Sequence, residues 1–315
     1  MCGYCRICFG YFELQPNVIQ RVKLGRWPSS EDVEPNTPIG LSCSIAKLPF
    51  IKPEETWVSA PSCIHFHKGD WHSGAERYRR WINTWMKIAE KPRWVSEGIS
   101  WQTTNMNWPD DLIPFRFSDI PKMAKDAIDC GVNVLQIYGF HRGGLDRGYP
   151  DYYPDHRLGT PEDLSKAVEK ANELGVKVIL FVNDQVADIN TEWYEKELYK
   201  YIAADRFGKP KHVGWGFHTF SEKNFWGYRQ LAIMCPYVKG YQDIIVEQLE
   251  RLAEWGANGF QIDKLGIGGL CYDETHGHRP AEAFSQGIVE TLRRIHEACR
   301  KHDPEFSIAA ETCWD

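Results

Sequence analysis

The sequence lacks any run of about 18 apolar residues, so it predicts no membrane-spanning helix. Its 315 residues carry no basic excess; the formal net charge is -6, which argues against a nucleic-acid partner. Met1 is not followed by a basic segment and an apolar stretch, so no signal peptide is predicted in this chain and the localisation stays open. No low-complexity segment or internal sequence repeat is present.

Cysteine is present without the spacing of a disulfide scaffold. The ten cysteines are scattered, which favours a reducing compartment. Cys2, Cys5 and Cys8 are the one cluster, but a zinc or iron–sulfur centre needs a fourth ligand nearby and none follows until Cys43. We therefore predict a strand with small apolar side chains there, and no metal or cofactor.

The chain divides into three stretches. Residues 1–70 are rich in proline and lack helical periodicity, which predicts a β-rich N-terminal portion in the form of a partial antiparallel β-sandwich. Residues 71–95 form a linking helix, because apolar residues recur at helical spacing from His72 to Ala89 before Pro92 ends it. Residues 96–315 alternate strands with helices, the pattern of parallel βα units.

This alternation predicts an α/β fold, a TIM-type (β/α) barrel. The predicted strands are Ile99–Gln102, Val132–Tyr138, Val176–Val182, a strand ending at Asp263, and Phe306–Glu311. The predicted helices are Ile120–Cys130, Thr160–Gly175, Gly240–Trp255 and Ala281–Lys301. Five strands are not eight, so we expect a fragment of a longer barrel truncated after the fifth strand; an open sheet is the alternative.

Two acids stand at the carboxyl ends of consecutive predicted strands. Asp263 ends the fourth strand and Glu311 ends the fifth. Barrel enzymes perform their chemistry at this edge, and neighbouring strands lie about 4.8 Å apart. Cleavage of a glycosidic bond needs two carboxyl groups across that bond, so this pair predicts glycoside hydrolysis. The competing interpretation is structural: Asp263 pairs with Lys264 or a histidine, and Glu311 caps a helix.

Several segments resemble glycoside hydrolase barrels. The stretch Gly259-Phe260-Gln261-Ile262-Asp263-Lys264-Leu265-Gly266 looks like the nucleophile strand of the α-amylase superfamily and of the α-galactosidase/α-glucosidase clan. Gly175–Asp184 resembles the strand before it, and Tyr149–Asp155 resembles a loop of related barrels. The resemblance covers about residues 70–315 and extends to the DUF6259-type family of glycosidase-like proteins.

This resemblance implies roles for the two acids. Asp263 corresponds to the nucleophile of a retaining, double-displacement mechanism. Glu311 corresponds to the strand-five acid/base of the α-amylase superfamily, whereas the α-galactosidase/α-glucosidase clan uses an aspartate after strand six. The amylase pattern has an arginine where this chain has Gln261, which argues against close amylase kinship.

Polar and aromatic residues near the strand ends are candidates for binding a sugar. Hydroxyl groups need donors and acceptors, and sugar rings stack on aromatic faces. The candidate substrate-binding residues are Trp101, Gln102, Asn105, Tyr138, His141, Asn183, Asp184, Gln185, Gln261, Lys264, His276, His278 and Trp314. For each of them a loop contact or core packing is the competing interpretation.

The leading hypothesis is thus a retaining glycoside hydrolase acting on α-linked oligo- or polysaccharides, with a carbohydrate as its partner. One alternative is a non-catalytic carbohydrate-binding barrel. Another is a metal-dependent hydrolase that uses His65 and His67, or His276 and His278 with neighbouring acids. The sugar, the linkage and the oligomeric state stay open.

Overall fold

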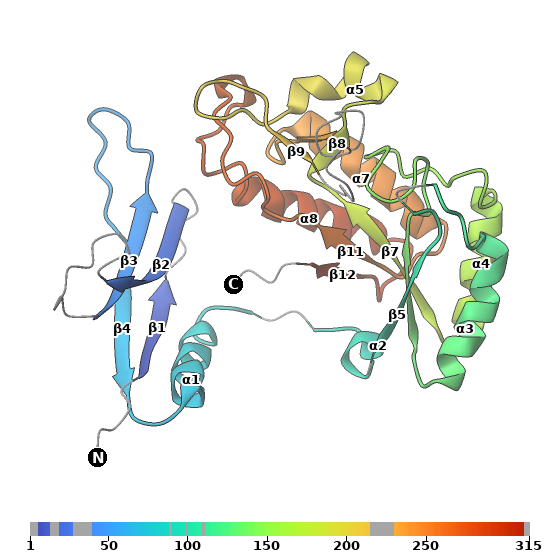
Figure 1. Cartoon of the computed structure of the whole chain (residues 1–315), viewed down its shortest axis with the longest axis horizontal. Coiled ribbons are helices and arrows are strands. Elements are labelled where there is room, and N and C mark those ends of the chain that lie inside the picture. Colours follow the sequence, from blue (N-terminus) through green and yellow to red (C-terminus); the bar gives the residue numbers. More distant parts are fainter. Residues whose placement is uncertain are drawn as a thin grey trace, which may run out of the picture. The chain divides into compact units, whose positions relative to one another are not determined.

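The computed structural model describes residues 6–12, 19–27, 40–87, 90–98, 100–108, 111–214 and 230–311. The chain forms two compact units, Met1–Glu90 and Lys91–Asp315 (Figure 1). The predictions for Cys2, Cys5 and Trp314 lie outside the described residues.

The first unit contains two antiparallel strand pairs. β1 (Arg6–Phe12) pairs with β4 (Ser62–His67), and β2 (Ile19–Trp27) pairs with β3 (Gly40–Leu48). The predicted antiparallel pairing is thus present, and the arrangement of the two pairs as a sandwich stays a prediction.

One helix, α1 (Trp71–Ile82), follows these strands. The Asp70 side chain caps it by accepting a hydrogen bond from the His72 amide at 3.0 Å. The helix ends earlier than predicted, because Thr84 bonds back to Trp81 in a tighter turn. Pro92 does not end this helix; it precedes the short α2 (Arg93–Ser96) of the second unit.

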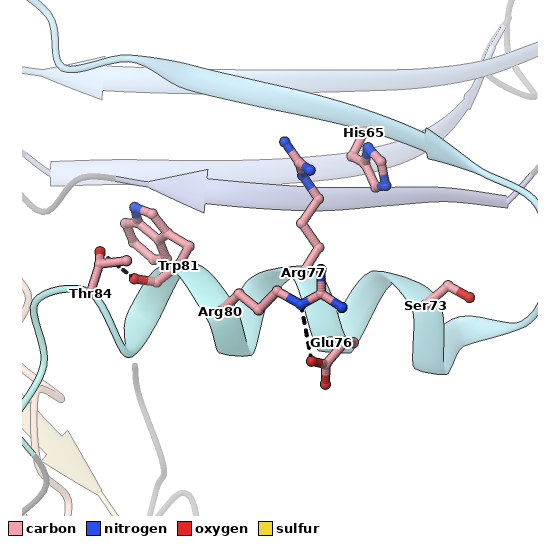
Figure 2. A pocket seen from close by; sticks show the side chains of 7 residues that line it. All are labelled: His65, Ser73, Glu76, Arg77, Arg80, Trp81 and Thr84. Carbon is pink, nitrogen blue, oxygen red and sulfur yellow. Dashed lines mark hydrogen bonds and ion pairs between the residues drawn. The ribbon is translucent and has the colours of Figure 1, made fainter.

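A groove runs along α1 in the first unit (Figure 2). Its volume is about 420 Å³, and its lining includes His65 of β4. Figure 2 shows Arg77 directed from the helix toward the strand that carries His65. Glu76 accepts hydrogen bonds from Arg79 and Arg80, but all three side chains are exposed, so these pairs contribute little to stability.

The second unit is built on a parallel sheet of five strands. The spatial order is β12-β11-β7-β6-β5, and every neighbouring pair is parallel. The strands are β5 (Trp101–Asn105), β6 (Val134–Tyr138), β7 (Lys177–Asn183), β11 (Gly259–Asp263) and β12 (Ser307–Ala310). The α/β class with a five-stranded parallel sheet is therefore confirmed, and closure into a barrel stays a prediction.

Four long helices connect these strands. They are α3 (Ile120–Asp129), α4 (Pro161–Glu173), α7 (Lys239–Glu254) and α8 (Gln286–Cys299). Proline occupies the first turn of α3 and of α4, as the sequence predicts. The predicted start of the last helix at Ala281 is wrong. Gly287 packs against the Tyr237 backbone, where a Cβ would lie 2.7 Å from the amide nitrogen, so the first turn of α8 needs glycine.

The two faces of the sheet differ because side chains alternate along each strand. One face, which includes Leu135, Leu180 and Ile262, packs into the core with the helices, as Leu249 and Ile295 show. The other face carries the polar residues of the candidate site. At its amino-terminal end Trp94 of α2 packs against Val134 and Ile179 and donates a hydrogen bond to the Glu305 carbonyl at 3.1 Å.

Short elements occupy the excursion between β7 and α7, where the sequence pattern predicts none. β8 (Val186–Asp188), β10 (Gln230–Ile233) and β9 (His212–Gly214) form an antiparallel sheet in that order. The described part of the unit also contains α5 (Glu192–Lys196) and the short 3-10 helices η1 (Phe117–Asp119), η2 (Leu198–Tyr201) and η3 (Glu274–His276). None of the helices in the described part of the chain is long and apolar enough to cross a membrane.

Candidate active site

The strand register brings the predicted site residues to one edge of the sheet. Asn183 at the end of β7 pairs with Asp263 at the end of β11. Ile262 pairs with Ala310, so Glu311, the residue directly after β12, is level with Asp263. The Glu311 amide donates a hydrogen bond to the Ile262 carbonyl at 3.1 Å. The two acids therefore lie on the same face and at the same carboxyl-terminal edge.

Asp263 forms a buried ion pair with the residue that follows it. The Lys264 ammonium donates a short hydrogen bond to Asp263 and approaches Asp146 at 3.4 Å. Burial alone lowers the pKa of Lys264, but the two carboxylates outweigh it and leave that pKa raised. One cation thus lies between two buried carboxylates.

The backbone at this ion pair adopts an uncommon conformation. Lys264 has φ 59° and Asp146 has φ 60°, both in the left-handed region that side chains other than glycine seldom occupy. Each such residue costs of order 1 kcal/mol or more and persists where its surroundings hold it. Asp146 comes from the loop after β6 and has no signal in the sequence, so sequence reasoning missed it.

Glu311 is in hydrogen-bond contact with Asp263. This bond raises the pKa of Glu311 to about 7, with burial and the Asp263 charge adding to the effect and Lys264 opposing it. A carboxyl group that keeps its proton near neutral pH can act as an acid. Glu311 is therefore suited to donate a proton near neutral pH.

Tyr138 lies on the same face, one strand beyond β7. Its hydroxyl donates to Gln261 at 3.1 Å, and its ring stacks on Phe181 with centroids 4.3 Å apart. Burial raises the pKa of Tyr138, and the charges of Glu311 and Asp263 raise it further. Gln261 is thus committed to a hydrogen bond within the sheet where the amylase pattern has an arginine.

Three consecutive polar residues at the end of β7, Asn183, Asp184 and Gln185, are fully buried. Asn183 accepts from the Gln185 amide at 3.1 Å, and Gln185 accepts from the Gly266 amide at 2.9 Å, which ties the loop after β11 to β7. Burial raises the pKa of Asp184 to about 7. One of its carboxyl oxygens has no hydrogen-bond partner among the described residues.

His141 is also fully buried. Its ring stacks on Tyr149 at 5.1 Å, and burial lowers its pKa to about 4. The ring lies inside the core, which favours the packing interpretation, and a sugar contact by His141 stays a prediction. Trp101 is 38% exposed on the edge strand β5, which also contains Gln102 and Asn105. The strand predicted over Ile99–Gln102 is placed too early, because β5 begins at Trp101 and extends to Asn105.

The two candidate histidines of the loop after β11 lie apart from these contacts. His276 and His278 face Cys271 and Cys235. These four residues form one group of potential metal ligands, and neither cysteine is among the predicted site residues. The neighbouring acids Asp273 and Glu274 do not belong to this group. Among the described residues, His65 and His67 belong to no group of potential metal ligands.

A family model matches most of this chain. The chain belongs to the family described as a domain of unknown function, DUF6259, which matches residues 58–314. The resemblance read from the strand motifs is confirmed at this level.

One characterised relative is similar in sequence. An "A type blood alpha-D-galactosamine galactosaminidase" of Flavonifractor plautii is 22% identical over 253 residues. The match covers 76% of this chain and 21% of the relative, so the chain spans about a fifth of that protein.

Solved glycosidase structures share the fold. The GH36 α-galactosidase AgaA of Geobacillus stearothermophilus is 16% identical with a TM-score of 0.57, covering 86% of this chain and 36% of its own. The α-N-acetylgalactosaminidase NagBb of Bifidobacterium bifidum, in its GalNAc complex, is 15% identical with a TM-score of 0.61, covering 79% and 41%. At these identities the likeness concerns the fold alone.

Proposed function

We propose that this protein is a retaining glycoside hydrolase that acts on α-linked sugars. The observation that carries the proposal is the paired carboxyl groups of Asp263 and Glu311 at the carboxyl-terminal edge of a parallel sheet. This edge is where barrel enzymes hold their catalytic groups. The sequence similarity to an "A type blood alpha-D-galactosamine galactosaminidase" supports the substrate class.

Asp263 is the nucleophile in this mechanism. Its carboxylate attacks the anomeric carbon and the leaving-group oxygen departs, which forms a covalent glycosyl–enzyme intermediate that water then hydrolyses. Lys264 holds this carboxylate in an ion pair, and the left-handed backbone of Lys264 turns its side chain back onto Asp263. Asp146 is a second carboxylate partner of the Lys264 ammonium, at 3.4 Å.

Glu311 is the proposed acid/base. With a pKa of about 7 it carries the proton needed by the departing oxygen and then takes a proton from the attacking water. Its hydrogen bond to Asp263 brings the carboxyl groups closer than the roughly 6.5–9.5 Å of inverting enzymes. The competing assignment is an aspartate after strand six, as in the α-galactosidase/α-glucosidase clan.

The test of Asp263 uses the full-length protein and aryl α-galactosides with and without a 2-acetamido group. We expect Asp263→Asn to lower kcat by at least about a thousandfold while sugar binding persists, because the amide keeps the shape but cannot attack. Azide added to Asp263→Ala should restore turnover and yield the β-glycosyl azide, which identifies the lost group as the nucleophile.

The matched control is Asp126→Asn, because Asp126 is an exposed residue of α3 that pairs only with Lys122 of the same helix in the described structure. Its kcat should stay at the wild-type value. Unchanged hydrolysis in Asp263→Asn contradicts the nucleophile assignment. Sugar binding by a wild-type protein that hydrolyses none of these α-glycosides points instead to a non-catalytic carbohydrate-binding barrel.

A further inference from the structure

The loop between β11 and α8 contains a cluster of soft metal ligands. Cys271, His276 and His278 come from this loop, and Cys235 comes from the segment directly after β10. One potential ligand atom from each of the four lies within 4.8 Å of the other three. Cys235 is fully buried, Cys271 is 1% exposed, and both histidines are half-buried.

In each imidazole, the ring nitrogen that points away from the cysteines hydrogen-bonds to a backbone carbonyl, which orients the ring. His276 Nε2 lies 3.2 Å from the Lys200 carbonyl, and His278 Nδ1 lies 2.9 Å from the Arg279 carbonyl. A carbonyl only accepts, so in the neutral rings these nitrogens carry the protons. The lone pairs are then on His276 Nδ1, 3.5 Å from Cys271 Sγ, and on His278 Nε2, 3.1 Å from Cys235 Sγ.

This arrangement matches the surroundings of a protein-bound metal. A metal-ligating histidine usually donates its other N–H to a carbonyl or carboxylate, which fixes the ring and its tautomer. Asp273 adds a carboxylate 3.6 Å from His276 Nε2, on the side away from the thiols. Both thiols are free and form no disulfide.

The spacing of the ligand atoms suits zinc. With Zn–S bonds of about 2.3 Å and Zn–N bonds of about 2.0–2.1 Å, tetrahedral ligand atoms lie roughly 3.3–3.8 Å apart. The four atoms here need to move by only about 1 Å or less to reach that geometry. A tetrahedral set of two sulfurs and two nitrogens is typical of zinc or of an iron–sulfur centre, and two cysteines with two histidines are a usual ligand set of structural zinc.

We propose that Cys235, Cys271, His276 and His278 bind one structural Zn²⁺ ion. Binding releases the two thiol protons to solvent and leaves the metal with four protein ligands. No coordination position then remains for a water molecule, so the ion does not generate a hydroxide nucleophile. The site is independent of the proposed glycosidase chemistry.

The metal has a clear structural task. In the described structure, η3 is the sole regular element in residues 264–285, the loop that begins directly after Asp263. Loops of this length without elements of their own are uncommon in compact domains. The zinc ties this loop to the end of β10, beside the hydrogen bonds of Tyr272 to Ala204 and of Lys211 to Leu270. It thereby fixes the loop that follows the candidate nucleophile.

The test measures metal in the full-length protein purified under reducing conditions without added metal. We expect about one zinc ion per chain by elemental analysis, with loss of that zinc in Cys235→Ser and in Cys271→Ser. The matched control is Cys130→Ser, which removes an exposed thiol of the same unit and should keep the zinc. Asp273→Asn should also keep the zinc, because Asp273 lies outside the ligand set.

A spectroscopic measurement covers the case in which a cysteine variant does not fold. Wild-type protein is stripped with a chelator and titrated with Co²⁺; we expect thiolate-to-cobalt charge-transfer bands and the strong visible bands of a tetrahedral site, both removed by Zn²⁺. Absence of these bands, or zinc content unchanged in both cysteine variants, overturns the proposal. So does a protein mass showing a disulfide between Cys235 and Cys271 with no bound metal.

Discussion

At the scale of single residues, the candidate site contains carboxyl groups with different tasks. Asp263 pairs with the Lys264 ammonium, Glu311 hydrogen-bonds to Asp263, and the buried Asp184 accepts a hydrogen bond from the Gln185 side chain. The pKa of Glu311 is raised to about 7 mainly by its hydrogen bond to Asp263, and the pKa of Asp184 is raised to about 7 by burial. The pH dependence of activity and of stability therefore reports on different members of the set.

Glu311 is expected to set the alkaline limit of activity. The group must be protonated to act as the acid, and its pKa in the protein without substrate is about 7, so kcat/KM should fall as the pH rises above about 7. In Glu311→Gln this limit should disappear and kcat should drop about 10²–10⁴-fold, with a smaller loss for substrates that have good leaving groups. The measurement is a pH profile of kcat/KM for both proteins.

An alkaline limit that persists unchanged in Glu311→Gln would assign the acid to another residue. The aspartate after strand six of the α-galactosidase/α-glucosidase clan is then the first to test. Glu290→Gln serves as the control, because Glu290 is an exposed partner of Arg293 on α8.

Asp184 is expected to lower stability as the pH rises. Its pKa is about 7 in the folded protein and 3.8 ordinarily, so the folded state binds the proton more tightly. The resulting stability is full below about pH 4 and is lost as the pH rises to about 7. Asp184→Asn should therefore unfold at a higher urea concentration than wild type at pH 8. Its free energy of unfolding there should be larger by more than about 1 kcal/mol, with little gain at pH 4.

Urea unfolding followed by circular dichroism at the two pH values measures this difference. Asp129→Asn, at the exposed end of α3, should change the free energy of unfolding by less than about 0.5 kcal/mol at both. An equal gain for Asp184→Asn at pH 4 and pH 8 would mean that packing, not charge, causes it.

At the scale of elements, caps and register position the site. Thr160 and Asp163 form a reciprocal capping box at the start of α4, with bonds of 3.2 and 2.9 Å. We expect Thr160→Ala to lower the free energy of unfolding by about 0.5–2 kcal/mol, measured by urea unfolding. Glu169→Ala, on the exposed face of the same helix, is the control and should change it by less than about 0.5 kcal/mol. An equal loss in both variants contradicts the capping role.

The boundaries of elements were harder to predict than their types. Thr160 and Pro161 signal the start of α4 directly, because capping chemistry is local. α8 begins at Gln286, and the close approach of Gly287 to Tyr237 in its first turn is a contact across the fold that no local pattern reveals. The antiparallel sheet of β8, β10 and β9 escaped prediction because strands of three or four residues are too short to show a period.

At the scale of the whole molecule, the second unit is a parallel five-stranded α/β sheet like part of the GH36 glycosidases. One sheet face packs against helices, and the other carries polar residues such as Gln261 and Asp263. The chain spans a fifth of the galactosaminidase that it resembles, so the proposals on substrate and mechanism concern the full-length protein.

The sequence by itself determined the alternation of strands and helices and the position of Asp263 and Glu311 at strand ends. Both follow from periodicity and breakers within a few residues. The tertiary structure alone decided that Asp146 meets Lys264 and that Cys235 meets His278. Those partners are 118 and 43 residues apart along the chain. Such contacts depend on how loops from different strands close over the sheet, and loop closure has no period that a sequence can display.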